Sequence, residues 1–268
     1  MSVASVNPPQ DRIKISVLPL INRLAIWGGL ALITILAWIY LLRMPMSAGM
    51  DMPGMPGMKM AISQPHQWML GDAVTAFVMW TVMMVAMMVP SASPMVTMYA
   101  GAVRAHGANA SFKIALFATG YIVAWTLFSA VATLIQLVLQ KTGLISTNLA
   151  VAPVIGGAIL IVAGLYQVTP LKQACLRYCR SPLGFFMTYW REGPAGAFVM
   201  GLRHGLFCVG CCWMLMALLF AAGVMNLLWV ALIAIFVLLE KVLPLERLVT
   251  NFAGLALFGV GIWIAVVR

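Results

Sequence analysis

The stretch "AGAFVMGLRHGLFCVGCCWMLMALLFA", residues Ala195–Ala221, decides the fold class of this chain. Arg203 is its only permanently charged residue, and most of the others are apolar. About 20 apolar residues are enough to cross a bilayer as an α-helix, in which the backbone hydrogen bonds are all made within the segment. The sequence therefore predicts a transmembrane helix here.

The composition extends this conclusion to the whole chain. Of 268 residues, 63% are hydrophobic and only 8% are charged, which is too little polar surface to cover a water-soluble domain. We therefore expect an all-α, polytopic helical membrane protein with about seven transmembrane helices. The predicted spans are Leu24–Leu42, Val74–Tyr99, Phe112–Leu139, Leu149–Val168, Ala195–Ala221, Leu227–Leu243 and Asn251–Val267.

The basic residues predict the orientation of the chain. Most of them fall on the cytoplasmic side if the N-terminus is cytoplasmic, as the positive-inside rule requires. The net charge of +10 then reflects topology and contact with membrane lipids, and it gives no reason to expect a nucleic-acid partner. We expect a multi-pass protein of the bacterial inner membrane. Its predicted parts are an N-terminal tail with the first helix (1–43), an external methionine-rich loop (44–73) and a six-helix membrane domain (74–268).

The external loop contains "GMDMPGMPGMKM", residues Gly49–Met60, in which methionines alternate with helix breakers. A thioether is a soft, neutral donor that suits Cu(I) and is poor for magnesium, calcium or zinc. Exposed methionines have nothing to pack against, which favours metal capture over a low-complexity linker. The candidate ligands in this loop are Met50, Met52, Met55, Met58 and Met60, followed by His66.

The second span carries further methionines, in "VMWTVMMVAMMVPSASPMVTM" (Val78–Met98). At about 100° per residue, they form two adjacent stripes, and Met83, Met87 and Met88 are the candidate ligands. Pro90 and Pro94 remove backbone donors, and we expect nearby serines to bond the carbonyls that this frees. The alternative is ordinary helix packing with a proline kink.

The fifth span has the densest set of metal-binding side chains. His204, Cys208 and Cys211 are spaced i, i+4, i+7 and share a helix face, with Cys212 beside them. Counted from the short link to the sixth span, Glu240 lies at the same depth as Cys208. These residues and the methionines of the second span are predicted to converge on one soft-metal site.

Simpler interpretations of these residues stay open. The cysteines can be small apolar fillers, and Glu240 can form an ion pair with Arg203. Cys208 and Cys211 can also form a redox pair, although they lie in the middle of a helix. In the inner loop, Cys175 and Cys179 share a face that favours an amphipathic helix bound to lipid headgroups, with a metal exit site as the alternative.

The motifs "AMMVPSASP", "GLRHGLFCVGCCW" and the "EK" of the sixth span resemble a bacterial family of predicted metal-binding integral membrane proteins. The resemblance covers about Val74–Val267 and rests mainly on the pattern His-Gly-x3-Cys-x2-Cys-Cys-Trp. It implies a bound metal but no particular reaction. The residues to which it points are Met87, Met88, Pro90, His204, Cys208, Cys211, Cys212, Glu240 and Lys241.

We therefore expect a copper-binding membrane protein that carries Cu(I). It would act either as a permease or as a delivery factor for a copper-dependent membrane or periplasmic protein. The sequence contains no nucleotide-binding loop, so ATP is not expected to drive it directly. The rival functions are a thiol-redox membrane protein and an accessory structural subunit of a larger membrane complex.

Overall fold

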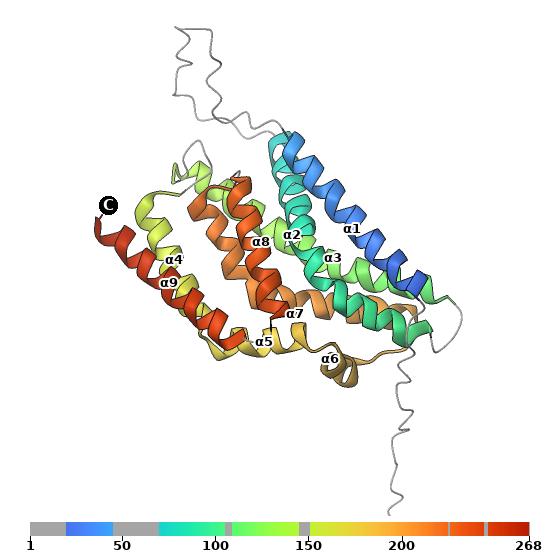
Figure 1. Ribbon diagram of the computed structural model, residues 1–268. Helices are drawn as coiled ribbons and strands as arrows, with labels where there is room; N and C mark the ends of the chain where they lie inside the picture. The colour runs from blue at the N-terminus through green and yellow to red at the C-terminus, as the bar shows by residue number, and fades with distance from the viewer. Residues whose placement is uncertain are drawn as a thin grey trace, which may run out of the picture.

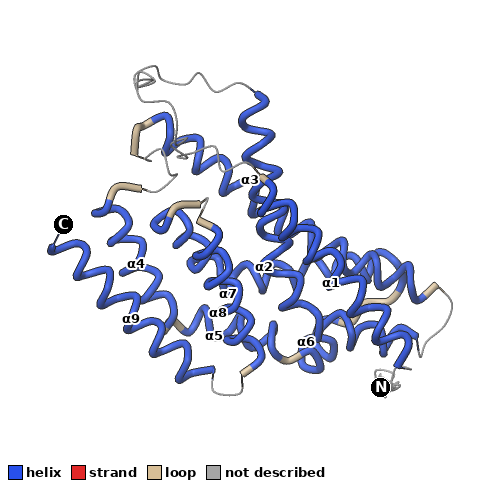
Figure 2. Tube along the Cα trace, turned by 45° about the horizontal axis from the view of Figure 1, so that its top comes forward, coloured by secondary structure: helices blue, strands red, loops and turns tan. Residues whose placement is uncertain are grey.

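The computed structural model describes residues 20–44, 70–104, 109–144, 151–224, 226–243 and 246–267, and over these ranges the protein is all-α (Figures 1 and 2). The all-α part of the predicted fold class is therefore confirmed. The helices in the described ranges are α1 (Leu20–Arg43), α2 (Leu70–Arg104), α3 (Ala110–Lys141), α4 (Pro153–Gln167), α5 (Pro170–Arg180), α6 (Pro182–Tyr189), α7 (Gly193–Ala222), α8 (Leu227–Val242) and α9 (Glu246–Val267).

Five of these helices are long and apolar enough to cross a membrane: α1, α2, α3, α7 and α9. A sixth is obtained if α4 and α5, which meet at 65°, form one bent span. The helix α8 has 16 residues and is shorter than a typical span, although its bounds agree with the predicted sixth span to within one residue. Over the described ranges, five or six helices thus meet the length and composition of a span, against the expected number of about seven.

The region 169–194, expected to be an inner loop with an amphipathic helix around Cys175 and Cys179, contains two short helices. Thr169 caps α5, since its hydroxyl accepts a hydrogen bond from the Lys172 backbone N–H at 3.3 Å, and a proline follows at the first helical position. Ser181 caps α6 in the same way through Gly184, again followed by proline. These caps explain why the chain forms helices here.

The helix α7 is central, because it contacts α3, α4, α5 and α8. Its approach to α3 depends on Gly201, where a Cβ atom would run into the backbone of Phe117. At its C-terminal end the chain turns at Gly223, whose φ of 89° is accessible to glycine. Asn226 then caps α8, which runs back along α7 as the short link predicts (Figure 1).

The helix α2 continues through both of its prolines. Pro94 has no N–H to donate to the carbonyl of Pro90, and Ser93 supplies the missing donor through its hydroxyl at 2.8 Å. The predicted role of the serines is thus confirmed at this position. An unbroken α2 keeps its methionines in register with the cysteines of α7.

Candidate metal site

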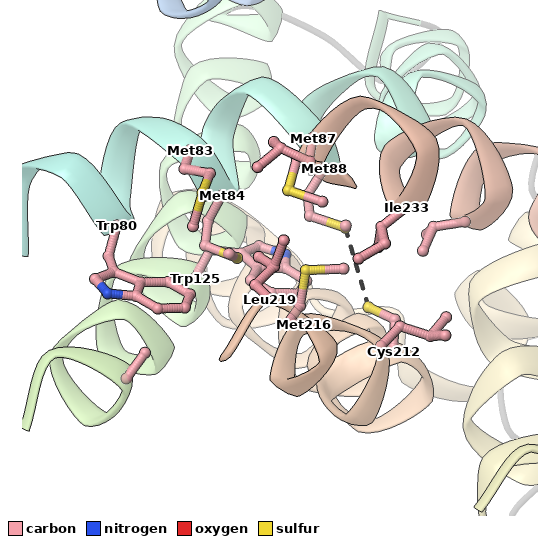
Figure 3. Packing of buried hydrophobic residues seen from close by; sticks show 14 of the residues in the cluster. Trp80, Met83, Met84, Met87, Met88, Trp125, Cys212, Met216, Leu219 and Ile233 are labelled. Carbon is pink, nitrogen blue, oxygen red and sulfur yellow. Dashed lines mark hydrogen bonds between the residues drawn. The ribbon is translucent and has the colours of Figure 1, made fainter. Parts of the chain in front are cut away.

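The candidate site is a cluster of buried sulfur atoms between α2, α7 and α5, which we call the sulfur cluster. Each of its sulfur-bearing side chains is exposed by 9% or less. Figure 3 shows the methionines of α2 facing Met216 and Cys212 of α7, with Ile233 of α8 beside them. The members of the sulfur cluster are Met83, Met84, Met87, Met88, Cys179, Cys208, Cys211, Cys212 and Met216.

Cys208 occupies the most polar position in the sulfur cluster. The ammonium group of Lys241 on α8 lies 2.9 Å from its sulfur, and the hydroxyl of Tyr121 on α3 lies 3.2 Å away. The Tyr121 hydroxyl donates to the backbone carbonyl of Met88 at 3.0 Å, so the Cys208 thiol donates to Tyr121 in turn. Lys241 therefore begins a chain of donors that passes through Cys208 and Tyr121.

A second chain from Lys241 ends at the same carbonyl. Lys241 donates to the hydroxyl of Ser91 at 2.9 Å, and Ser91 donates to the carbonyl of Met88 at 2.9 Å. The two chains close a ring that joins α2, α3, α7 and α8. Such a connected polar network fixes side-chain positions in a low-dielectric interior, where an unpaired polar group would be costly.

The remaining cysteines lie around this ring as free thiols. Cys211 and Cys212 both donate to the backbone carbonyl of Cys208, at 3.1 and 2.9 Å. Their sulfurs also face other helices: Cys212 is 4.0 Å from the Met88 sulfur, and Cys211 is 3.9 Å from the Cys179 sulfur of α5 (Figure 3 shows the Cys212–Met88 contact). The predicted convergence of α2 and α7 is therefore present in the structure.

His204 is buried as predicted, but aromatic rings surround it. Its imidazole stacks on Tyr121 and Phe117, at centroid distances of 5.5 and 6.3 Å, and meets the edge of Phe185 at 5.6 Å. Its Nδ1 atom has no hydrogen-bond partner among the described residues. The helix spacing therefore places His204 one turn from Cys208, in the aromatic region that adjoins the sulfur cluster.

Glu240 faces away from the sulfur cluster. Its carboxylate forms an ion pair with Lys172 of α5 at 2.5 Å and accepts a hydrogen bond from Thr250 at 3.2 Å. Lys172 also donates to Gln167 of α4. The pair that depth counting predicted, Glu240 beside Cys208, is replaced by Lys241 beside Cys208, because consecutive helix residues point about 100° apart. Arg203, the other expected partner of Glu240, lies over the Tyr189 ring.

The other predicted ligands divide into two groups. Met83, Met87 and Met88 are buried in the sulfur cluster, and Met88 has the closest contact with a cysteine. The external candidates Met50, Met52, Met55, Met58, Met60 and His66 lie outside the described residues.

The donor chemistry fits a soft monovalent ion. Thiols and thioethers are the donors that Cu(I) prefers, and the site offers both on neighbouring helices. Among the described residues, no three His, Cys, Asp or Glu side chains already hold the geometry of a metal-loaded site. The Cys208 thiol is engaged by Lys241 and Tyr121. Binding an ion would require Cys208 to exchange these contacts for the metal.

Sequence reasoning missed two residues that shape this region. Tyr121 belongs to α3, far along the chain from Cys208, and no local pattern marks it. Lys172 was counted as a basic residue of the inner loop, yet its side chain is fully buried. Its position after a Thr-Pro helix start was the available signal.

The fold and the site together define a class: helical proteins that enclose a cluster of soft donors between long apolar helices. A family model described as "PpoB2: Copper chaperone" matches residues 77–264. The match covers more than half of the chain, and the chain therefore belongs to this copper chaperone family. No curated protein and no solved structure matches it.

Proposed function

We propose that this protein is a copper chaperone of the bacterial inner membrane that holds Cu(I) in the sulfur cluster and delivers it to a copper-dependent membrane or periplasmic protein. The observation that carries this proposal is the placement of Cys208 and Cys211 on one buried helix face, beside Cys212, whose sulfur lies 4.0 Å from the thioether of Met88. The family membership supports copper as the cargo, and the word chaperone favours delivery over permeation.

The charge of the site supports binding as a Cu(I) bis-thiolate. One Cu(I) and the thiolates of Cys208 and Cys211 carry a net charge of −1, and the ammonium of Lys241 brings the sum to zero. A charge buried among apolar helices is costly unless it is paired. Lys241 is therefore assigned the role of counter-ion to the loaded site.

The methionines of the external loop and of α2 supply a route toward Cys208 and Cys211. The external loop, from Met50 to Met60, would capture copper, and Met83, Met87 and Met88 would pass it along α2 toward Cys212 and Cys208. Thioethers bind Cu(I) as neutral donors, whereas a thiolate adds charge attraction. An ion that moves from thioether to thiolate donors thus gains affinity at the step between α2 and α7.

Metal content tests this function. The protein would be purified in detergent under reducing conditions, loaded with Cu(I) and washed, together with a Cys208→Ser/Cys211→Ser double variant. Both proteins would carry isoleucine at Met44, Met46, Met50, Met52, Met55, Met58 and Met60, so that the loop adds no copper to the measurement. We expect about one copper ion per chain in the protein that keeps Cys208 and Cys211, and none in the double variant. Equal copper in both proteins, or none in either, would instead support a structural subunit or a thiol-redox protein.

A further inference from the structure

We infer that Cys179 of α5 is the third sulfur ligand of the copper site, together with Cys208 and Cys211 of α7. This inference rests on the proposed function and deepens it. Cys179 belongs to α5, a short helix that is not one of the five long apolar helices, and we assign it to the buried site.

The spacing of the sulfur atoms is the first argument. Two sulfurs that each lie about 2.3 Å from one ion, the bond length of zinc–thiolate sites, are about 4.0 Å apart when the angle between the bonds is 120°. The same bonds in a linear arrangement would place them about 4.6 Å apart. The Cys179 and Cys211 sulfurs are 3.9 Å apart, which matches trigonal coordination. Cys211 in turn donates to the backbone carbonyl of Cys208 at 3.1 Å, so Cys179 adjoins the helix turn that carries both cysteines of α7.

The position of Cys179 is fixed by contacts at both ends of α5. Lys172 anchors the first turn of the helix to Glu240, and Arg180 anchors its end through hydrogen bonds to the carbonyls of Lys241, at 3.2 Å, and Leu243. Gly210 lets α5 approach α7, because a Cβ atom there would lie 2.9 Å from the Cys175 sulfur. A sulfur held in this way costs little further entropy when it binds an ion.

Exposure distinguishes Cys179 from the two cysteines of α7. Its side chain is 9% exposed, whereas Cys208 and Cys211 are each 1% exposed. A third thiolate makes the loaded site negative even with Lys241 nearby, and this charge is least costly at the most exposed position.

Binding involves ligand exchange and no electron transfer. Cu(I) keeps its oxidation state, Cys208 exchanges its contact with Lys241 for the ion, and each thiol that binds as a thiolate releases one proton to solvent. No oxidant, reductant or further reactant is required.

The test is X-ray absorption spectroscopy on the full chain in which isoleucine replaces the seven loop methionines from Met44 to Met60, loaded with one Cu(I) per chain. Three proteins are compared: this parent, Cys179→Ser and, as a matched control on the same helix, Cys175→Ser. We expect three sulfur donors in the parent and in Cys175→Ser, and two sulfurs with shorter bonds in Cys179→Ser. Competition with a chromogenic Cu(I) chelator should show an affinity loss of at least about tenfold for Cys179→Ser, since even outer-shell changes at metal sites reach that size.

The outcomes separate the inference from the function on which it rests. Two sulfurs in the parent would overturn the inference without reference to any variant, and so would an unchanged sulfur count in a correctly folded Cys179→Ser. In both cases bound copper would leave the proposed function standing. A parent that binds no copper would overturn both.

Discussion

The Nζ atom of Lys241 lies 2.9 Å from the Cys208 sulfur, so a fixed cation adjoins the cysteine that the copper site most needs. The Cys208 side chain is 1% exposed, Lys241 is half-buried, and the ammonium also donates to the Ser91 hydroxyl at 2.9 Å. A partly buried cation with no carboxylate partner among the side chains that the structure describes requires a reason, because burial of a charge is costly. The negative charge of a Cu(I) bis-thiolate supplies that reason.

Replacement of Lys241 by leucine, which removes the charge without adding a sulfur donor, should therefore weaken copper binding. At an effective dielectric constant of about 20, a unit charge about 4 Å away contributes about 4 kcal/mol, and about 1.4 kcal/mol already corresponds to tenfold in affinity. We expect a loss of more than about tenfold in Cu(I) affinity, measured by chelator competition. Lys141→Leu, at the exposed end of α3, is the control and should change nothing. Tighter binding in Lys241→Leu would mean that the ammonium competes with copper.

The cysteines of α7 should differ in importance. Cys208 and Cys211 are expected to be essential, whereas Cys212→Ser should retain stoichiometric copper, because the Cys212 sulfur faces Met88 on α2. His204→Ala should also retain the ion, since aromatic rings surround the imidazole. Metal analysis of each single variant, in the full chain with isoleucine at the seven loop methionines, checks this order. Complete loss of copper in Cys212→Ser would place the ion closer to α2 than we propose.

The methionine-rich loop should matter only when copper is scarce. Isoleucine would replace Met44, Met46, Met50, Met52, Met55, Met58 and Met60, which preserves apolar character while removing every thioether from the loop. We expect unchanged membrane insertion and normal copper loading at ample supply, with reduced loading at limiting copper. Copper content of the membrane fraction across a range of copper concentrations is the measurement. Normal loading at the lowest concentration would identify the loop as a linker.

The sequence predicted the long helices well and the short ones poorly. Long apolar runs mark α2, α3 and α7 to within a few residues, because a helix that faces lipid is apolar along its whole length. The helices α5 and α6 have no such run. An amphipathic helix was expected around Cys175 and Cys179, where α5 lies, but α6 was not expected. The start signals Thr169-Pro170 and Ser181-Pro182 were present for both helices.

The candidate site was predictable along each helix but not between helices. Helix spacing predicted that Cys208 and Cys211 share one face. Counting residues from the α7–α8 turn correctly predicted which part of α8 lies at the depth of Cys208. Depth alone does not determine which side chain faces inward, so Glu240 was chosen although Lys241 makes the contact. Tyr121 required knowledge of how α3 packs on α7, which depends on the close approach at Gly201.

Loss of one partner of the buried ion pair between Lys172 and Glu240 should destabilise the protein, whereas apolar replacement of both partners should be tolerated. Glu240→Gln leaves the Lys172 ammonium without its counter-charge, and Lys172→Met leaves the carboxylate unpaired, so each should lower the free energy of unfolding by about 3–5 kcal/mol. The double variant Lys172→Met/Glu240→Leu removes both charges and should recover most of that loss, since apolar replacement of a buried pair is often neutral. Denaturant unfolding in detergent, arranged as a double-mutant cycle, measures the coupling. If the two single losses simply add, each residue acts on α5 independently, and the anchoring of Cys179 by this pair is wrong.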